Sequence, residues 1–168
     1  MLNRRDFIKV GCSGLAGFAV SQGVMRPAVA GEPAIQAQAY PVVDIARLSS
    51  IKRGAVVPFT YPDPRSPAVL VHLDEPASDG IGPNNEIVAY STLCTHKGCP
   101  VNYKPERKLF ICPCHWSTFD PAKAGVLVIG QASESLPQIE LRVLAGSVQA
   151  FGVRGLIYGR YTNIVQAG

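Results

Sequence analysis

Two short segments rich in cysteine and histidine constrain this 168-residue chain more than any other feature. Each segment places a thiol and an imidazole close together, and each carries one further cysteine. Fifteen residues (97–111) separate His96 from Cys112, which is enough for a loop, a turn and one strand that returns to the same edge. The fold must therefore bring both segments to one place. The paired residues are Cys94 with His96 and Cys112 with His115, and the further cysteines are Cys99 and Cys114.

The rest of the chain indicates an all-β domain. Short runs of β-type residues recur between clusters of Pro, Gly, Asp and Asn. No segment has a ten-residue helical period, and 14 Pro with 16 Gly favour turns. The sequence predicts an antiparallel β sandwich or small barrel, with both Cys/His segments at strand ends and therefore at one tip. The expected strands are 42–45, 55–61, 68–73, 86–91, 108–112, 139–143, 147–151 and 156–158.

The N-terminus predicts an export signal. Arg4 and Arg5 precede a mild, glycine-broken apolar run, and a small-residue cleavage pattern ends at Ala30. Residues 1–30 resemble a twin-arginine signal, which predicts export of a folded protein to the periplasm. The alternative is an uncleaved leader that anchors the protein in the membrane. We expect a loose arm over 31–40 and one domain over 41–168.

The charge balance excludes one class of partner. The formal net charge is +4, but residues 1–30 hold four basic groups and one acidic group. The remaining chain has 12 basic residues against 11 acidic ones. A nucleic-acid partner would require a basic face, so we expect none.

The Cys/His pattern closely resembles that of the Rieske iron–sulfur family. Two Cys and two His could instead hold zinc, but zinc leaves the further cysteines unexplained. The resemblance implies one [2Fe–2S] cluster per chain, with Cys94 and Cys112 on one iron and His96 and His115 on the other. It also implies a disulfide between Cys99 and Cys114 that joins the two loops. Histidine ligation raises the reduction potential above that of an all-cysteine cluster.

Two residues after the second segment resemble positions that tune the cluster in this family. Ser117 matches a serine that donates a hydrogen bond to a cluster sulfide in high-potential members. Phe119 stands where those members have a tyrosine whose hydroxyl reaches a ligand sulfur. The missing hydroxyl is expected to lower the potential, because hydrogen bonds to sulfur stabilise the reduced state.

The chain also resembles the small subunit of arsenite oxidase over nearly all of residues 41–165. This resemblance implies an oxidoreductase subunit that accepts electrons from a large molybdopterin subunit, where arsenite is oxidised. It implies a soluble acceptor, such as cytochrome c or azurin. Two alternatives are a quinol-oxidising Rieske subunit of a cytochrome bc complex and a cytoplasmic ferredoxin. The resemblance rests on 89–96, 116–121, 130–138 and 156–160.

Overall fold

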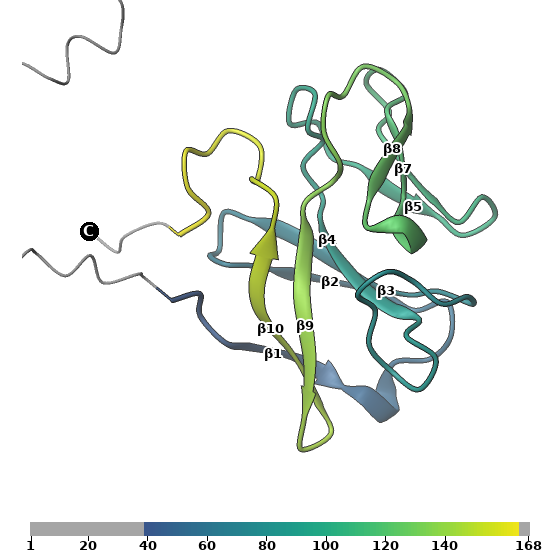
Figure 1. Ribbon diagram of the computed structural model, residues 1–168, viewed down its shortest axis with the longest axis vertical. Helices are drawn as coiled ribbons and strands as arrows, with labels where there is room; N and C mark the ends of the chain where they lie inside the picture. Colours follow the sequence, from purple (N-terminus) through teal and green to yellow (C-terminus); the bar gives the residue numbers. More distant parts are fainter. Residues whose placement is uncertain (1–38, 165–168) are drawn as a thin grey trace, which may run out of the picture. The chain divides into compact units, whose positions relative to one another are not determined.

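The computed structural model describes residues 39–164, and it is built from antiparallel strands (Figure 1). The expected signal over 1–30, with Arg4 and Arg5, lies outside the described residues, as does most of the arm over 31–40. The prediction of an antiparallel all-β domain is confirmed. The strands are β1 (Val43–Arg47), β2 (Val56–Thr60), β3 (Pro67–His72), β4 (Ile87–Ser91), β5 (Asn102–Lys104), β6 (Leu109–Ile111), β7 (Thr118–Asp120), β8 (Val126–Ile129), β9 (Gln138–Leu144) and β10 (Ser147–Arg154).

A six-stranded sheet forms the larger half, in the order β1-β10-β9-β4-β3-β2. Its central strand β4 is buried along its whole length, because both faces of the strand are covered. Apolar side chains from one face form a core with the fully buried Leu70 and Val148. The other face of β4 points toward the smaller sheet, and this arrangement joins the two sheets.

The smaller sheet has the order β5-β6-β7-β8 and lies at the upper end of the molecule in Figure 1. Aromatic rings link it to the larger sheet. The ring centroids of Tyr90 on β4 and Phe110 on β6 are 5.6 Å apart, and the Tyr90 hydroxyl donates to the Pro121 carbonyl at 2.8 Å. Both free cysteines of the described chain, Cys94 and Cys112, belong to this second core.

The expected strand over 156–158 is wrong. β10 ends before Gly155, which has a φ of +87°, and the chain then turns. Ile157 is fully buried, and its N–H donates to the Asn163 side chain at 2.9 Å and not to a neighbouring strand. We call residues 155–164 the C-terminal strap. An ion pair of 2.6 Å between Arg160 and Asp63 holds the strap to the turn before β3.

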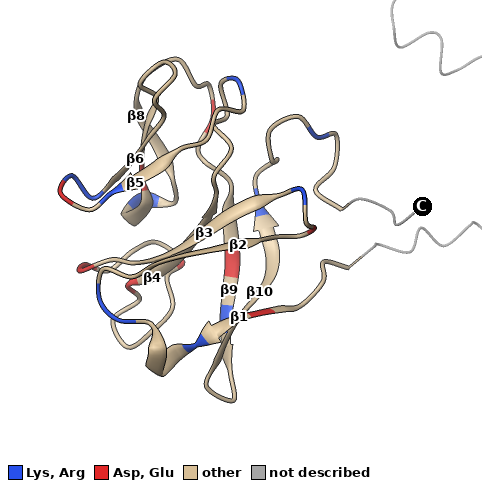
Figure 2. Ribbon diagram, turned by 180° about the vertical axis from the view of Figure 1, so that it is seen from behind, with Lys and Arg blue, Asp and Glu red and all other residues tan. Residues whose placement is uncertain are grey.

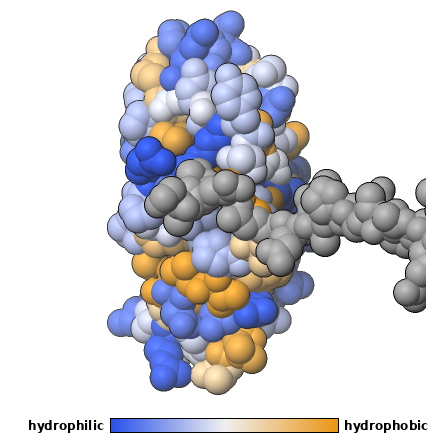
Figure 3. Space-filling view, turned by 90° about the vertical axis from the view of Figure 1, so that its left-hand side faces the viewer, coloured by the Kyte–Doolittle hydropathy of each residue, from blue (hydrophilic) through white to orange (hydrophobic). Residues whose placement is uncertain are grey.

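Charged residues of both signs are interspersed along the ribbon (Figure 2). Figure 3 shows apolar residues on the lower half of one face, where the six-stranded sheet lies. Within residues 39–164, no helix has both the length and the apolar character needed to cross a membrane.

Candidate metal centre

Two loops with the same backbone hydrogen bonds carry the Cys/His segments. We call residues 94–99, between β4 and β5, the first ligand loop, and residues 112–117, between β6 and β7, the second. In the first loop, the Cys94 N–H donates to the Cys99 carbonyl at 2.9 Å, and the Gly98 N–H donates to the Cys94 carbonyl at 2.8 Å. In the second loop, the Cys112 N–H donates to the Ser117 carbonyl at 2.9 Å, and the Trp116 N–H donates to the Cys112 carbonyl at 3.0 Å. This equivalence was not predicted from the sequence.

The fifth residue of each ligand loop has a positive φ. Gly98 has a φ of +71°, and Trp116 has a φ of +62°. Glycine adopts this conformation at little cost, whereas a residue with a Cβ does not. Gly98 is also covered, since a Cβ built there would lie 2.5 Å from the Tyr158 ring of the C-terminal strap. Trp116 is 70% exposed, so the second loop leaves a large apolar side chain in solvent.

These two positions give opposite expectations on substitution. We expect Gly98→Ala to lower the free energy of unfolding by roughly 1–3 kcal/mol, because it adds both backbone strain and a clash with Tyr158. Trp116→Gly removes the strain at this positive φ, but glycine also raises the conformational entropy of the unfolded chain. On balance we expect the free energy of unfolding to rise by up to about 1 kcal/mol. Denaturant unfolding of the two variants measures both changes. Equal stability of Gly98→Ala and the parent protein would contradict this account.

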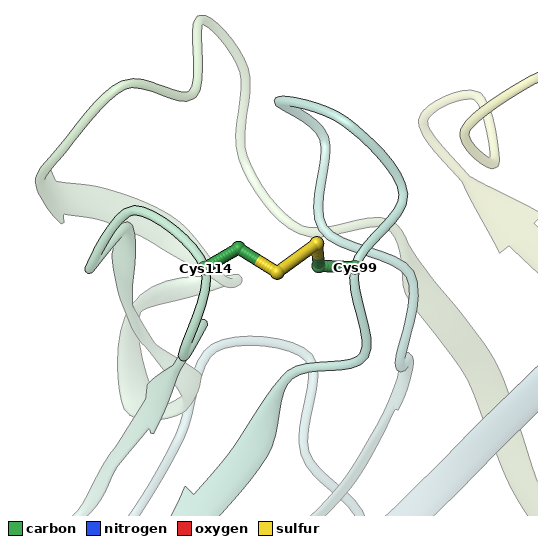
Figure 4. Close-up of a disulfide and its surroundings, with 2 residues drawn as sticks. All are labelled: Cys99 and Cys114. Atoms are coloured by element: carbon green, nitrogen blue, oxygen red, sulfur yellow. A yellow bond between two sulfur atoms is a disulfide. The ribbon is translucent and has the colours of Figure 1, made fainter.

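A disulfide between Cys99 and Cys114 joins the two ligand loops (Figure 4). The two Cα atoms are 6.5 Å apart, and 15 positions separate the residues in sequence. This pairing confirms the expectation from the family resemblance. The Cys112 sulfur lies within 4.8 Å of both disulfide sulfurs, so the disulfide lines the site. Because its two sulfurs are bonded to each other, they cannot serve as thiolate ligands.

The free thiols lie inside and the imidazoles lie outside. Cys94 and Cys112 are each 1% exposed, whereas His96 is half-buried and His115 is exposed. The two imidazole centroids are 4.8 Å apart. Burial raises the pKa of the Cys94 thiol, and the neighbouring Cys112 adds to this, while the main-chain N–H groups of His96 and Lys97 act in the opposite direction. A metal would therefore have to replace the thiol protons.

The donor set fits an iron–sulfur cluster better than zinc. Both thiols are on the inner side and both imidazoles are on the outer side, so each kind of ligand can serve a different metal ion. A single zinc would instead require all four donors around one point. His72, the remaining histidine, lies far from both loops in sequence, and it contacts the Ile51 carbonyl at 3.1 Å and Glu86 at 3.4 Å. These contacts within the larger half of the fold give His72 a structural role.

The two expected tuning residues are both fully buried next to the second ligand loop. Ser117 ends that loop and accepts hydrogen bonds from the segment that follows β8. Phe119, on β7, pairs with Phe110 across the small sheet and belongs to the core that contains both free cysteines. The fold therefore brings both residues to the site, although their effect on a cluster stays a prediction.

Three features in or beside the ligand loops were not identified from the sequence as part of the site. Tyr158 lies against Gly98, and Trp116 is exposed at the tip. The segment between β8 and β9 contacts both loops. The Thr95 hydroxyl of the first loop donates to the Glu134 carbonyl at 2.9 Å, and the Ser117 hydroxyl of the second loop accepts a hydrogen bond from the Gln131 N–H. These contacts use mainly backbone groups, which leave little signal in the residue types.

Comparison with known proteins places these observations in a family. The Rieske [2Fe-2S] domain matches residues 42–140. The iodate reductase subunit IdrB of Denitromonas iodatirespirans is 41% identical, over 96% of this chain and 86% of that protein. The subunit of the same name from Pseudomonas sp. (strain SCT) is 37% identical, over 94% of this chain and 82% of its own length. Among solved structures, the soluble domain of Rieske protein II (soxF) from Sulfolobus acidocaldarius has a TM-score of 0.61 and 25% identity, over 68% of this chain and 78% of that one.

Proposed function

Because this chain belongs to the Rieske [2Fe-2S] family, we propose that it is the electron-transfer subunit of an oxidoreductase that converts an oxyanion. Cys94 and Cys112 would hold one iron of the cluster, and His96 and His115 would hold the other. The bound cluster takes up and releases one electron at a time, at a potential raised by its imidazole ligands. The observation that carries this proposal is the placement of two buried thiols beside two adjacent imidazoles on equivalent loops.

The chain's own residues insulate one side of the site and open the other. Core side chains around the buried thiols exclude water, while His115 and Trp116 reach solvent. A redox partner would therefore approach over the imidazoles, where the path for an electron is shortest. The disulfide and the loop hydrogen bonds hold these groups in place, so little rearrangement accompanies transfer.

A large catalytic subunit is the proposed partner, with a molybdopterin as its cofactor. The names of the relatives support iodate reduction as the overall reaction, because the similarity extends over nearly the whole chain. The resemblance to the arsenite oxidase small subunit over nearly all of residues 41–165, which rests on segments such as 130–138, supports arsenite oxidation instead. Both reactions change an oxyanion by two electrons per step, and an electron relay works in either direction. A soluble carrier such as cytochrome c or azurin is the proposed partner on the other side.

Purification of the tagged full chain from its native cells tests this function. We expect the reduced protein to give a rhombic EPR signal, with about two irons per chain, and a large molybdenum-containing subunit to copurify. The complex should then reduce iodate or oxidise arsenite. Copurification with a cytochrome b, without molybdenum, would support the quinol-oxidising alternative. Stoichiometric zinc without an EPR signal would overturn the cluster assignment.

We also propose export to the periplasm through the twin-arginine route. Replacement of Arg4 and Arg5 by lysine is expected to leave the precursor in the cytoplasm, because the route reads the arginine pair as an address. Cell fractionation followed by N-terminal sequencing measures the outcome, and the parent protein is expected to begin at Gly31. A periplasmic protein that retains its leader in the membrane fraction would contradict cleavage and favour the anchor.

Phe119→Tyr is expected to raise the midpoint potential. A hydroxyl that donates to a ligand sulfur stabilises the reduced cluster, and only the difference between the two redox states counts. A hydrogen bond to a charged group contributes roughly 1.5–3 kcal/mol to stability. For the transfer of one electron, a tenfold change in the equilibrium constant corresponds to about 59 mV. We therefore expect a shift of several tens of millivolts.

Protein-film voltammetry measures this shift, and Phe110→Tyr is the matched control. Phe110 is equally buried and lies opposite Phe119, but its ring packs against Tyr90 and Tyr103. The control adds the same hydroxyl to the same core and should leave the potential nearly unchanged. No rise in Phe119→Tyr with an intact cluster would show that this position does not tune the centre.

A further inference from the structure

The segment Gly130–Ala132, which we call the support segment, contacts the end of the second ligand loop. The main-chain N–H groups of Gln131 and Ala132 both donate to the Ser117 hydroxyl oxygen, each at 3.1 Å. Ser117 is fully buried, and Ala132 is buried beside it. This contact links a residue of the second loop to the chain between β8 and β9, 14 and 15 positions later in the sequence.

These two hydrogen bonds restrict the hydroxyl hydrogen of Ser117. A serine hydroxyl has one hydrogen to donate and two lone pairs that accept. Both lone pairs are used by the support segment, so the hydrogen must point along the one remaining direction. Among the described residues, this hydroxyl accepts two hydrogen bonds and donates none. A buried donor without an acceptor is costly, which indicates that the acceptor is a group bound between the loops.

Glycine at position 130 is what allows this approach. Gly130 has a φ of +120°, which a residue with a side chain rarely adopts. A Cβ built there would lie 2.4 Å from the Ser117 Cα, 2.8 Å from its nitrogen and 2.9 Å from its hydroxyl oxygen. Any larger residue would therefore push the support segment away from Ser117 and break both hydrogen bonds.

We propose that the support segment sets the reduction potential of the cluster, because its two N–H groups orient and polarise the Ser117 hydroxyl toward the cluster sulfur atoms. The inference rests on the ligand set of the proposed function. Donation to a hydroxyl oxygen makes its own hydrogen a stronger donor, since hydrogen bonds in a chain reinforce one another. The stronger donor favours the reduced cluster, which carries one more negative charge. Gln131 and Ala132 act through Ser117 and are positioning residues.

The effect has a sign that separates it from simple loosening of the site. Loss of the two N–H donors weakens the Ser117 hydrogen bond and lowers the midpoint potential. Entry of water would instead stabilise the extra charge of the reduced cluster and raise the potential. A variant that merely opens the site therefore moves the potential upward, and a variant that releases Ser117 moves it downward.

Gln131→Pro in the full-length, cluster-loaded protein is the main test. Proline has no N–H, so this change deletes one donor while replacing an exposed side chain. Ser133→Pro is the matched control, because Ser133 is exposed in the same connection and its N–H does not donate to Ser117. Ser117→Ala, alone and combined with Gln131→Pro, completes a double-mutant cycle. Protein-film voltammetry gives the potentials, and the EPR signal of each reduced variant shows that the cluster is present.

We expect Gln131→Pro to lower the potential by less than Ser117→Ala does, and to cause no further shift once Ser117 is alanine. Ser133→Pro should cause no shift. Gly130→Ala, as a second variant, should also lower the potential, by more than Gly54→Ala, because Gly54 also has a positive φ, of +77°, but no atom within 4 Å of its Cβ position.

Three results would overturn the proposal: a rise in potential, equal shifts in the two proline variants, or a Gln131→Pro shift that persists without the Ser117 hydroxyl. Amide hydrogen exchange gives a readout that does not depend on electron transfer, and the Gln131 and Ala132 amides should lose protection in Ser117→Ala. If the parent protein lacks the EPR signal, the proposed function fails; if the signal is present and the cycle is additive, only this inference fails.

Discussion

Replacing Cys112 with serine, or His115 with alanine, is expected to reduce the iron content from about two per chain to nearly none and to abolish the EPR signal. Each change removes a donor from a set that has no spare. The thiols of Cys99 and Cys114 cannot substitute, since they are joined in a disulfide. Iron analysis and EPR of the reduced, purified variants measure the loss. This is the largest effect that the structure predicts, because the remaining donors cannot complete the coordination of the iron that loses its ligand.

The control for this experiment is His72→Asn. It removes the one histidine of the chain that lies outside the ligand loops, on β3. Its contacts are the Ile51 carbonyl and the Glu86 carboxylate, so the variant is expected to lose some stability and to retain its iron. Retention of a full cluster by Cys112→Ser would refute the ligand assignment. Full occupancy of the parent protein by zinc would also refute the assignment of these residues to an iron–sulfur cluster.

Removal of the disulfide by Cys99→Ala with Cys114→Ala is expected to lower the free energy of unfolding by about 3 kcal/mol, the value typical of a closed loop of this length. The bridge spans 15 positions and connects the two ligand loops. The variant should still assemble the cluster, because the four proposed donors and the loop hydrogen bonds remain. The cluster should then be lost faster on heating or in denaturant.

Unfolding followed by far-UV circular dichroism and by the visible absorbance of the cluster separates these effects. Both cysteines are replaced together, so that no reactive single thiol is left at the exposed Cys114 position. Unchanged stability would show that the bridge contributes nothing to the folded state. A complete failure to assemble the cluster would show that the disulfide is required for the site to form, and not only for its persistence.

The sequence was most informative where side chains carry the pattern. Continuous runs of apolar residues predicted β3 and β4 closely, since both faces of these strands pack against a core. The strands β5, β7 and β8, with three or four residues each, were missed because so short a run has no measurable period. The strand expected over 156–158 was wrong because burial of Ile157 comes from a turn fixed by Asn163, not from sheet pairing.

In the candidate site, too, the sequence identified the residues that act through their side chains and missed those that act through the main chain. Cysteine and histidine residues were identifiable because their chemistry is rare and their spacing is regular. The support segment was not, because its role lies in main-chain N–H groups and in a glycine that permits close approach. The conformation of Trp116 was not predictable either, since the residue type does not indicate a positive φ. Such contacts depend on how the chain returns to the site, which is a property of the fold.

The equivalence of the two ligand loops has a consequence for the order of folding. Each loop is closed by hydrogen bonds between residues no more than five positions apart. Loops of about ten residues close within roughly 10–100 ns, whereas contacts between distant segments form far more slowly. Each loop can therefore take its final backbone shape early, as a local event that needs no metal. The pairing of β5 with β6, which places Asn102 opposite Ile111, then brings the two loops together, and an incoming cluster encounters two half-sites that already have their shape.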